Sequence, residues 1–346
     1  MKLLFYFLLP LLFFAGCGER VREHYTVIQG EGIGTYYQIT YRSLGGEELD
    51  VKAGVDSILR EMNQLFSIFL KTSVIEEFNH SACGIANAEF AALTEQAMGY
   101  ARLSSGAFDP TVAPLIRLWG FGPEATEVPD SATVAAQLAK VGYVHVGVRG
   151  DSVVKDLPSL SLDYNGIAKG YAVDKIARYL SEHAVADYLV NVGGEISARG
   201  VSGRGTSWVL GIETPRKGAQ FGESLMRCLQ VSDRALATSG NYRSFHEKGA
   251  FSWGHTINPQ TGFPESNLLR SATVLAPTCT MADALATALM VMGLERAKAL
   301  VEGLKEVEAV LIFANSAEDE SAGFSLWYSA GMASLLMPES EASSAK

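Results

Sequence analysis

The segment DYNGIAKGYAVD, residues 163–174, constrains the fold most, because it predicts where extended chain gives way to a helix. Leu160 and Leu162 lead into it, and Gly166 removes side-chain bulk at the turn. The apolar residues that follow recur at the spacing of one helical face: Ile167, Ala168, Tyr171, Ala172, Ile176, Ala177 and Leu180. The segment therefore predicts a strand, a glycine turn and a helix in that order.

The start of this predicted helix indicates a binding site for an anion. The first N–H groups of a helix lack partners within it, and the helix dipole is positive at that end. Lys169 adds a full positive charge in the first turn. A plain strand-to-helix turn explains the same residues, since glycine marks many such turns.

A second segment, CTMADALATALMVMG at 279–293, has no helix breaker before its last residue. It predicts a buried helix with Thr280 near the N-cap. Asp283 and Thr287 are four residues apart, so both project from one face. Mg²⁺ prefers such oxygen ligands and takes few carboxylates. Alternatively, the acid stabilises the helix dipole and the threonine bonds to its own backbone.

A third segment, GHTINPQTGFP at 254–264, predicts a stiff loop, because it contains two prolines and a glycine. His255 stands just before the loop. The loop could hold a ligand. It could also be a rigid connection in which Asn258 and Thr261 only satisfy the local backbone.

These three segments together resemble the ApbE family, flavin transferases that move FMN from FAD onto a threonine or serine of another protein. Five further blocks are similar to those of the family: GIGTYYQITY from Gly32, FSIFLKTSVIEEFN from Phe66, GAFDPTVAPLIRLWGFG from Gly106, YLVNVGGEI from Tyr188 and ATSGNYRSF from Ala237. The resemblance spans residues 25–335, which is nearly the whole chain.

The resemblance implies a set of site residues. Contacts to FAD are implied for Asp163, Lys169 and the turn formed by Gly106, Ala107, Phe108 and Asp109. Ile33 and Phe69 match positions that flank the flavin, and His255 with Ile257 matches the loop that closes over it. Mg²⁺ is implied to bind the backbone carbonyl of Gly166 and the side chains of Asp283 and Thr287. Phe69 departs from the tyrosine that relatives often have, which keeps the ring and removes a hydroxyl.

The implied reaction is Mg²⁺-dependent transfer of FMN from FAD to a threonine or serine hydroxyl, with AMP as the leaving group. His255 and Asp283 are the candidates for a general base, although a carboxylate that ligates a metal is a poor base. Two alternatives stay open: an Mg²⁺-dependent FAD pyrophosphatase that yields FMN and AMP, and a flavin-binding lipoprotein without catalysis. No segment matches the family's acceptor motif, so the acceptor flavoprotein is expected to be another chain.

The first 17 residues predict export. One basic residue precedes an apolar run, which is too short and too interrupted by Pro10 to span a membrane. FAGC resembles a bacterial lipobox and makes Cys17 the expected lipidation site. We expect a protein anchored by lipid to a bacterial membrane, on the periplasmic or extracytoplasmic side, with cleavage and secretion as the alternative.

Composition excludes several other classes. The formal net charge of −10 disfavours a nucleic-acid surface, which needs a basic face. An acidic enzyme that uses an anionic dinucleotide must concentrate positive charge locally, and Lys169 and a metal ion would supply that charge. The cysteines after Cys17 and the scattered histidines have no spacing typical of disulfide frameworks or zinc sites.

Periodicity predicts one α+β domain at 25–337, with extensive antiparallel sheet, packed helices and a disordered tail at 338–346. The predicted helices are 51–66, 88–103, 130–141, 167–180 and 280–292. The predicted strands are 36–41, 143–148, 188–192, 208–212, 226–231, 271–275 and 309–313.

Overall fold

A central eight-stranded sheet organises the chain, and every neighbouring pair of its strands is antiparallel. The computed structural model describes residues 24–43, 50–121, 128–216, 223–241, 245–248, 251–254, 256–316 and 322–338. In spatial order the strands are β1 (His24–Gly32), β2 (Thr35–Ser43), β6 (Tyr188–Val192), β7 (Glu195–Arg199), β10 (Arg234–Gly240), β13 (Leu269–Ala276), β14 (Glu308–Ala314) and β15 (Phe324–Tyr328).

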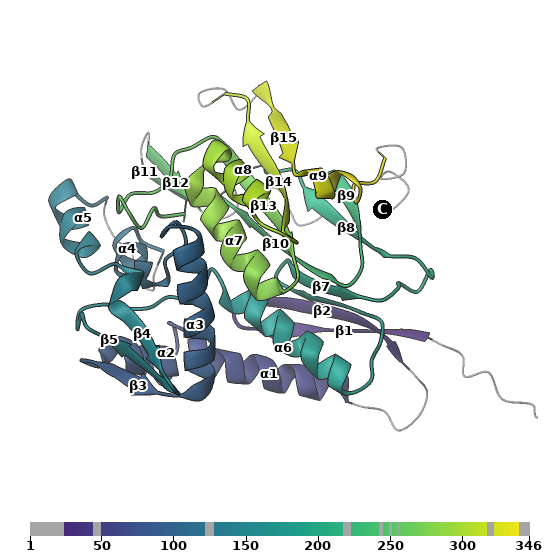
Figure 1. The fold of residues 1–346 in the computed structure, drawn as a ribbon, viewed down its shortest axis with the longest axis horizontal. Coiled ribbons are helices and arrows are strands. Elements are labelled where there is room, and N and C mark those ends of the chain that lie inside the picture. The colour runs from purple at the N-terminus through teal and green to yellow at the C-terminus, as the bar shows by residue number, and fades with distance from the viewer. Residues whose placement is uncertain are drawn as a thin grey trace, which may run out of the picture.

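Helices cover one face of this sheet (Figure 1). They form because apolar residues recur at helical spacing: in the first helix Val51, Val55 and Leu59 are buried on one stripe, and Asp50 caps its N-terminus. The covering helices are α1 (Val51–Phe66), α6 (Ala168–Glu182), α7 (Cys279–Met292) and α8 (Leu294–Gly303), and α3 (Ala88–Leu103) packs against α1 and α7.

The opposite face is covered by a hairpin of β8 (Trp208–Glu213) and β9 (Leu225–Val231), together with α9 (Ala330–Ala333). In β14, alternate side chains pack against the two covering layers. Ala309 and Leu311 pack with α7 and α8, whereas Val310 and Ile312 pack with the hairpin. Because successive side chains point to opposite faces, a strand covered on both sides is apolar throughout.

Smaller elements surround this core. A three-stranded sheet contains β3 (Gly84–Ala86), β5 (Ser152–Lys155) and β4 (Val146–Arg149), and β11 (Phe245–Lys248) pairs with β12 (Phe251–Gly254). The remaining helices are α2 (Val74–His80), α4 (Ala113–Leu118) and α5 (Ser131–Leu138), with 3₁₀ turns at Pro110–Val112 and Tyr143–His145. Within the ranges given above, no helix has both the length and the apolar character needed to cross a membrane.

The predicted α+β class, single domain and antiparallel sheet are confirmed. Three local predictions were wrong. Residues 160–163 are extended but belong to no strand, and residues 143–145 form a 3₁₀ turn before β4. Thr278, not Thr280, is the N-cap of α7, and its side chain accepts from the N–H of Met281. The signal segment, Cys17 and residues 339–346 lie outside the described residues, so the domain boundaries stay predictions.

Candidate active site

One cavity of about 1130 Å³ collects most of the predicted site residues from distant parts of the sequence. It lies between the sheet, the start of α6, the side of α7 and several loops. Its lining includes eleven predicted residues: Ile33, Phe69, Ala107, Phe108, Asp109, Asp163, Gly166, Lys169, Ile257, Asp283 and Thr287. Such a volume accommodates a dinucleotide-sized ligand, since pockets for small molecules measure roughly 300–1,000 Å³.

Two predicted residues are not part of the described lining. Gly106 is a backbone turn with φ of +79°, and a Cβ there would lie 3.3 Å from the Tyr143 ring. Glycine is favoured at this position because other residues rarely adopt positive φ. His255 lies outside the described residues.

Three charged side chains meet in the lining of the cavity. Lys169 comes from the first turn of α6, Asp283 from α7 and Glu195 from the first position of β7. The Lys169 ammonium forms an ion pair with Glu195 Oε1. The Glu195 side chain is 2% exposed and the Lys169 side chain is 33% exposed, so the carboxylate is enclosed while part of the lysine side chain lines the open cavity.

The charge balance of this group shifts the pKa values. Burial lowers the pKa of Lys169, but the Glu195 and Asp283 carboxylates outweigh it and raise that pKa to about 12. Burial raises the pKa of Asp283, and Lys169 and the Gly170 N–H act against that rise. Burial also raises the pKa of Glu195, to about 7, despite Lys169. Two carboxylates share one ammonium, so the group favours an additional positive charge when both are ionised.

A close helix crossing produces this arrangement. A Cβ on Gly170 would lie 2.3 Å from the carbonyl oxygen of Cys279, so only glycine lets α6 and α7 approach so closely. The two helices also cap each other. The N–H of Gly170 donates to Asp283 Oδ2 (3.0 Å), and the N–H groups of Cys279 and Thr280 donate to the Asp174 carboxylate (2.8 Å each).

This reciprocal capping changes the predicted anion site. At least one N–H in the first turn of α6 is already bonded to the Asp283 carboxylate. The attraction of the site for phosphate therefore depends on the Lys169 charge more than on free N–H groups of the helix. The alternative interpretation of Asp283 was that this acid stabilises the end of a helix. It does so for α6, through the Gly170 N–H, and not for its own helix α7.

The three residues implied to bind metal lie close together. A Cβ on Gly166 would be 3.1 Å from Thr287 Oγ1, and that hydroxyl lies 3.3 Å from Ser239 Oγ. One carboxylate, one hydroxyl and one carbonyl form a hard oxygen set that suits Mg²⁺. Over the described residues, no group of three or more His, Cys, Asp or Glu side chains could hold a metal. Carboxylate, hydroxyl and carbonyl oxygens are ligands for Mg²⁺ rather than for the softer transition metals.

Asp163 is held from both sides. Its carboxylate accepts from the backbone N–H (2.8 Å) and the side-chain amide (3.3 Å) of Asn165, and its own N–H donates to the Pro110 carbonyl (2.7 Å). Burial raises the pKa of this carboxyl. The turn that leads to Gly166 and Lys169 therefore fixes the position of the Asp163 carboxylate.

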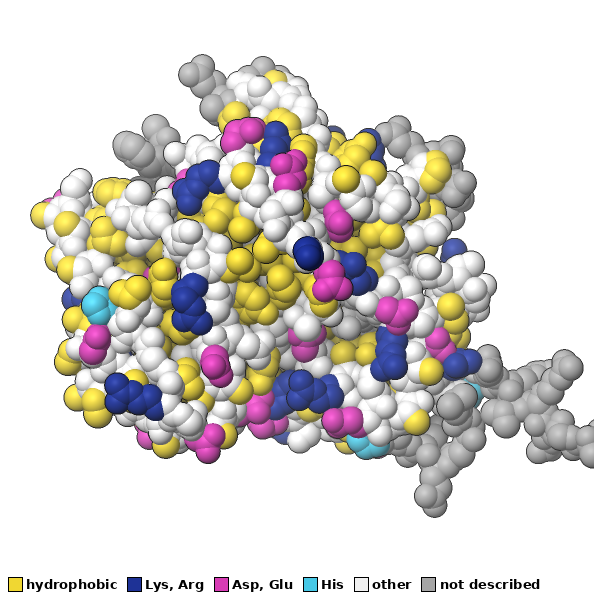
Figure 2. All heavy atoms as spheres, viewed as in Figure 1, with side chains coloured by type: hydrophobic (Ala, Val, Ile, Leu, Met, Phe, Trp, Pro, Cys, Tyr) yellow, Lys and Arg dark blue, Asp and Glu magenta, His cyan; other side chains and the backbone are white. Residues whose placement is uncertain are grey.

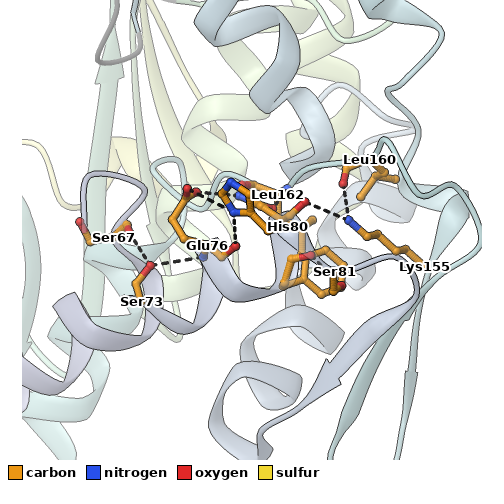
Figure 3. Close-up of polar contacts among 10 residues, drawn as sticks. Ser67, Ser73, Glu76, His80, Ser81, Lys155, Leu160 and Leu162 are labelled. Atoms are coloured by element: carbon orange, nitrogen blue, oxygen red, sulfur yellow. Dashed lines mark hydrogen bonds and ion pairs between the residues drawn. The ribbon is translucent and has the colours of Figure 1, made fainter. Parts of the chain in front are cut away.

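A polar network behind the cavity fixes the chain that enters this turn (Figure 3). Asn79 at the end of α2 bonds both the N–H (2.7 Å) and the carbonyl (3.1 Å) of Leu162. The buried Lys155 ammonium donates to the Leu160 carbonyl (2.8 Å). These side chains replace the strand pairing that residues 160–163 lack, because buried backbone groups need partners.

Asp109 is used within its own turn. Its Oδ1 accepts from the N–H (2.8 Å) and hydroxyl (2.6 Å) of Thr111, and its Oδ2 accepts from the Tyr143 N–H (3.0 Å). Burial raises its pKa, opposed by these bonds. Asp109 therefore shapes the cavity wall whether or not it also contacts a ligand.

The cavity lining also contains apolar residues. Phe69 is 63% exposed, and Ile33 has a φ of +47°, a strained conformation for a β-branched residue that is typical of functional sites. Hydrogen bonds hold the loop that carries Ile257: Asn258 Oδ1 accepts from the Gln260 N–H (2.8 Å), and Trp119 Nε1 donates to the Gly262 carbonyl (2.7 Å). Asn258 thus satisfies the local backbone.

Sequence reasoning missed Glu195 and Asp174. Glu195 pairs with Lys169, and Asp174 caps the start of α7. Hydrophobic periodicity marks neither residue. Glu195 directly follows the Gly193–Gly194 turn, and a carboxylate after a glycine pair at the end of a buried strand was the available signal. Asp174 closes the DYNGIAKGYAVD segment on the same helix as Lys169.

The surface seen in Figure 2 mixes basic and acidic side chains. Nucleic-acid sites gather basic residues on one face, and this view has no such arrangement among the described residues. The mixed surface agrees with a small-molecule or protein substrate.

Comparison with known proteins matches this chain to one family. The model described as the ApbE family matches residues 33–311. The FAD:protein FMN transferase of Vibrio cholerae serotype O1 is 36% identical over 302 residues, covering 85% of this chain and 89% of that protein. The FAD:protein FMN transferase of Escherichia coli K12 is 32% identical, and the match covers 95% of each chain.

Solved structures agree. The flavin transferase ApbE from Vibrio cholerae has a TM-score of 0.81 and 34% identity, covering 90% of this chain and 99% of that one. The apo form of the flavinyl transferase ApbE from Pseudomonas stutzeri has a TM-score of 0.79 and 30% identity, covering 90% and 97%.

Proposed function

This chain belongs to the ApbE family, and we propose that it transfers FMN from FAD to a serine or threonine hydroxyl of an acceptor protein, releasing AMP. The observation that carries the proposal is the 1130 Å³ cavity, whose lining combines a charged group with apolar residues. FAD combines the same two kinds of group, with a charged pyrophosphate in its middle and a flat apolar ring system at one end.

In this reaction the acceptor hydroxyl oxygen forms a bond to the FMN-side phosphorus of FAD. The bond from that phosphorus to the bridging oxygen breaks, AMP leaves with the bridging oxygen, and the hydroxyl proton is released. Lys169 stays protonated and faces the cavity, so it can hold the phosphate oxygens as their charge changes. Positioning and charge stabilisation carry most phosphoryl transfers.

Mg²⁺ is the cofactor that we propose for this site. The Gly166 carbonyl, the Asp283 carboxylate and the Thr287 hydroxyl would hold it, and the excess negative charge around Lys169 supports a cation there. When bound, Mg²⁺ neutralises charge on the phosphate oxygens. The α6–α7 crossing holds Asp283 in place for this task through the Gly170 N–H.

The test is to incubate the purified protein with FAD, Mg²⁺ and an acceptor domain that carries a Ser/Thr flavinylation motif. We expect flavin fluorescence on the denatured acceptor, an equal amount of AMP, and loss of both in EDTA. AMP with free FMN and an unlabelled acceptor would establish a pyrophosphatase instead. If the protein binds FAD but yields neither AMP nor FMN, free or attached, a flavin-binding role without catalysis would remain.

We further propose that the chain is exported and anchored to a bacterial membrane by lipid on Cys17. The support is the apolar run followed by FAGC. The full chain, expressed with labelled palmitate, should incorporate label, and Cys17→Ser should abolish it while Cys83→Ser does not. Label that persists in Cys17→Ser would contradict the anchor.

A further inference from the structure

Glu195 lines the cavity and has one buried hydrogen-bonding atom without a partner among the described residues. It begins β7 directly after the Gly193–Gly194 turn. One carboxylate oxygen pairs with Lys169, but the other, Oε2, is buried and has no hydrogen-bond partner among the described residues. A buried acceptor without a donor is destabilising, and native interiors contain few of them.

Among the described residues no donor reaches Oε2 in hydrogen-bond geometry, and the backbone N–H of Glu195 itself acts on the carboxylate as a whole. The Lys169 ammonium is directed at Oε1, and Asp283 is a second carboxylate, which accepts rather than donates when ionised. Asn191, two positions before the glycine turn, uses its carbonyl oxygen to accept from the Gly194 N–H (2.9 Å). A hydroxyl is a neutral donor that Oε2 can accept from, and the additional positive charge that the two carboxylates favour is the Mg²⁺ proposed at Asp283.

Given the proposed flavin transfer, on which this inference rests, we infer that Glu195 is a substrate-binding residue: its Oε2 accepts a hydrogen bond from a substrate hydroxyl group. Two sources carry that chemistry. FAD has hydroxyls on its ribityl chain and ribose, and the acceptor protein has the serine or threonine hydroxyl that attacks. In either case the same carboxylate also holds Lys169 beside the phosphates.

Glu195→Gln tests this role with little change in shape. The variant keeps one oxygen to accept from Lys169 and places an NH₂ group where Oε2 stood, so it removes the Oε2 acceptor together with the charge that pairs with Lys169. The matched control is Glu182→Gln, the same change at an exposed position on α6. For each protein we would measure the FAD dissociation constant by flavin fluorescence, the transfer rate at saturating FAD, and the thermal midpoint.

If the hydroxyl belongs to FAD, the dissociation constant should rise about tenfold, as expected for a hydrogen bond to a charged group. If it belongs to the acceptor, FAD binding should stay unchanged while kcat/KM for the acceptor falls by about the same factor. Values within about twofold of the wild type in both measurements would overturn the inference.

Two controls keep the result interpretable. If Glu195→Gln does not fold, Glu195→Asp replaces it, because it keeps the charge beside Lys169 but withdraws the oxygens by one methylene. Wild-type behaviour of a folded Glu195→Asp would then refute the role. If the wild type itself transfers no FMN, the proposed function fails, while FAD titration, which needs no turnover, still tests an FAD hydroxyl contact.

Discussion

The charged group and the apolar residues of the cavity lining are built differently. In the charged group, Lys169, Glu195 and Asp283 come from two helices and a central strand, and the backbones of α6 and α7 touch at Gly170. Among the apolar residues, Ile33 and Phe69 come from a turn and a loop, and Phe69 is 63% exposed.

This difference indicates which part of the lining is preformed. Buried charges need fixed partners, because an unpaired charge in the interior is costly, and helices hold such partners rigidly. Apolar contacts to a flat ring system tolerate small displacements, so loops suffice. We therefore expect substitutions in the charged group to stop the reaction, and substitutions of the apolar residues to weaken binding only mildly.

The largest effect should come from Asp283→Asn. The amide oxygen can still accept from the Gly170 N–H, so the fold should persist, but the charge that we propose for Mg²⁺ is lost. We expect transfer to fall by about a hundredfold or more, in the range for removing one group that stabilises a transition state. Initial rates and thermal melting would be compared with Asp151→Asn, at an exposed position. Full activity in Asp283→Asn would remove the metal assignment.

Gly170→Ala tests whether the helix crossing builds the charged group. The new Cβ would meet the Cys279 carbonyl at 2.3 Å, so α6 and α7 would have to separate. Overpacking of this kind lowers the free energy of unfolding by about 3 kcal/mol. Chemical denaturation would measure it against Gly99→Ala in α3, where a Cβ meets nothing within 4 Å. Equal stability of the two variants would show that the crossing is tolerant.

Asn79→Ala tests the support behind the Asp163 turn. The two hydrogen bonds to Leu162 would be lost, and the turn should become less well held. We expect the FAD dissociation constant to rise by up to about thirtyfold, since about 1 kcal/mol for each of the two bonds totals about 2 kcal/mol. Gln96→Ala is the control, because this exposed amide makes one long bond of 3.5 Å. An unchanged affinity in Asn79→Ala would mean that the turn is held by its other contacts.

The smallest effect is expected at Phe69. Phe69→Ala should weaken FAD binding about threefold, because one partly exposed ring contributes about 1 kcal/mol or less through stacking. Phe69→Tyr should bind FAD like the wild type, since the ring is kept. Fluorescence titration distinguishes these outcomes. A loss at Phe69→Ala as large as that of Asp283→Asn would erase the contrast between the charged group and the apolar residues.

Local sequence patterns predicted some parts of the fold and of the site and not others. The helices at 51–66 and 88–103 have the predicted bounds, because apolar spacing and caps are local properties. Lys169, Asp283 and Thr287 were predicted because motifs and the family resemblance marked them. The pairing of Lys169 with Glu195, 26 positions away, has no local signature.

The sequence by itself determined the α+β class, most helices and several strands, the motif residues and the family. Only the tertiary structure decided that Gly170 lets two helices touch, that Asp283 and Asp174 cap each other's helix, and that one buried oxygen of Glu195 has no partner among the described residues. The physical reason is the separation along the chain over which each interaction acts. Periodicity and capping act over one or two helical turns, whereas hydrogen bonds and ion pairs depend on which distant segments the packed core brings together.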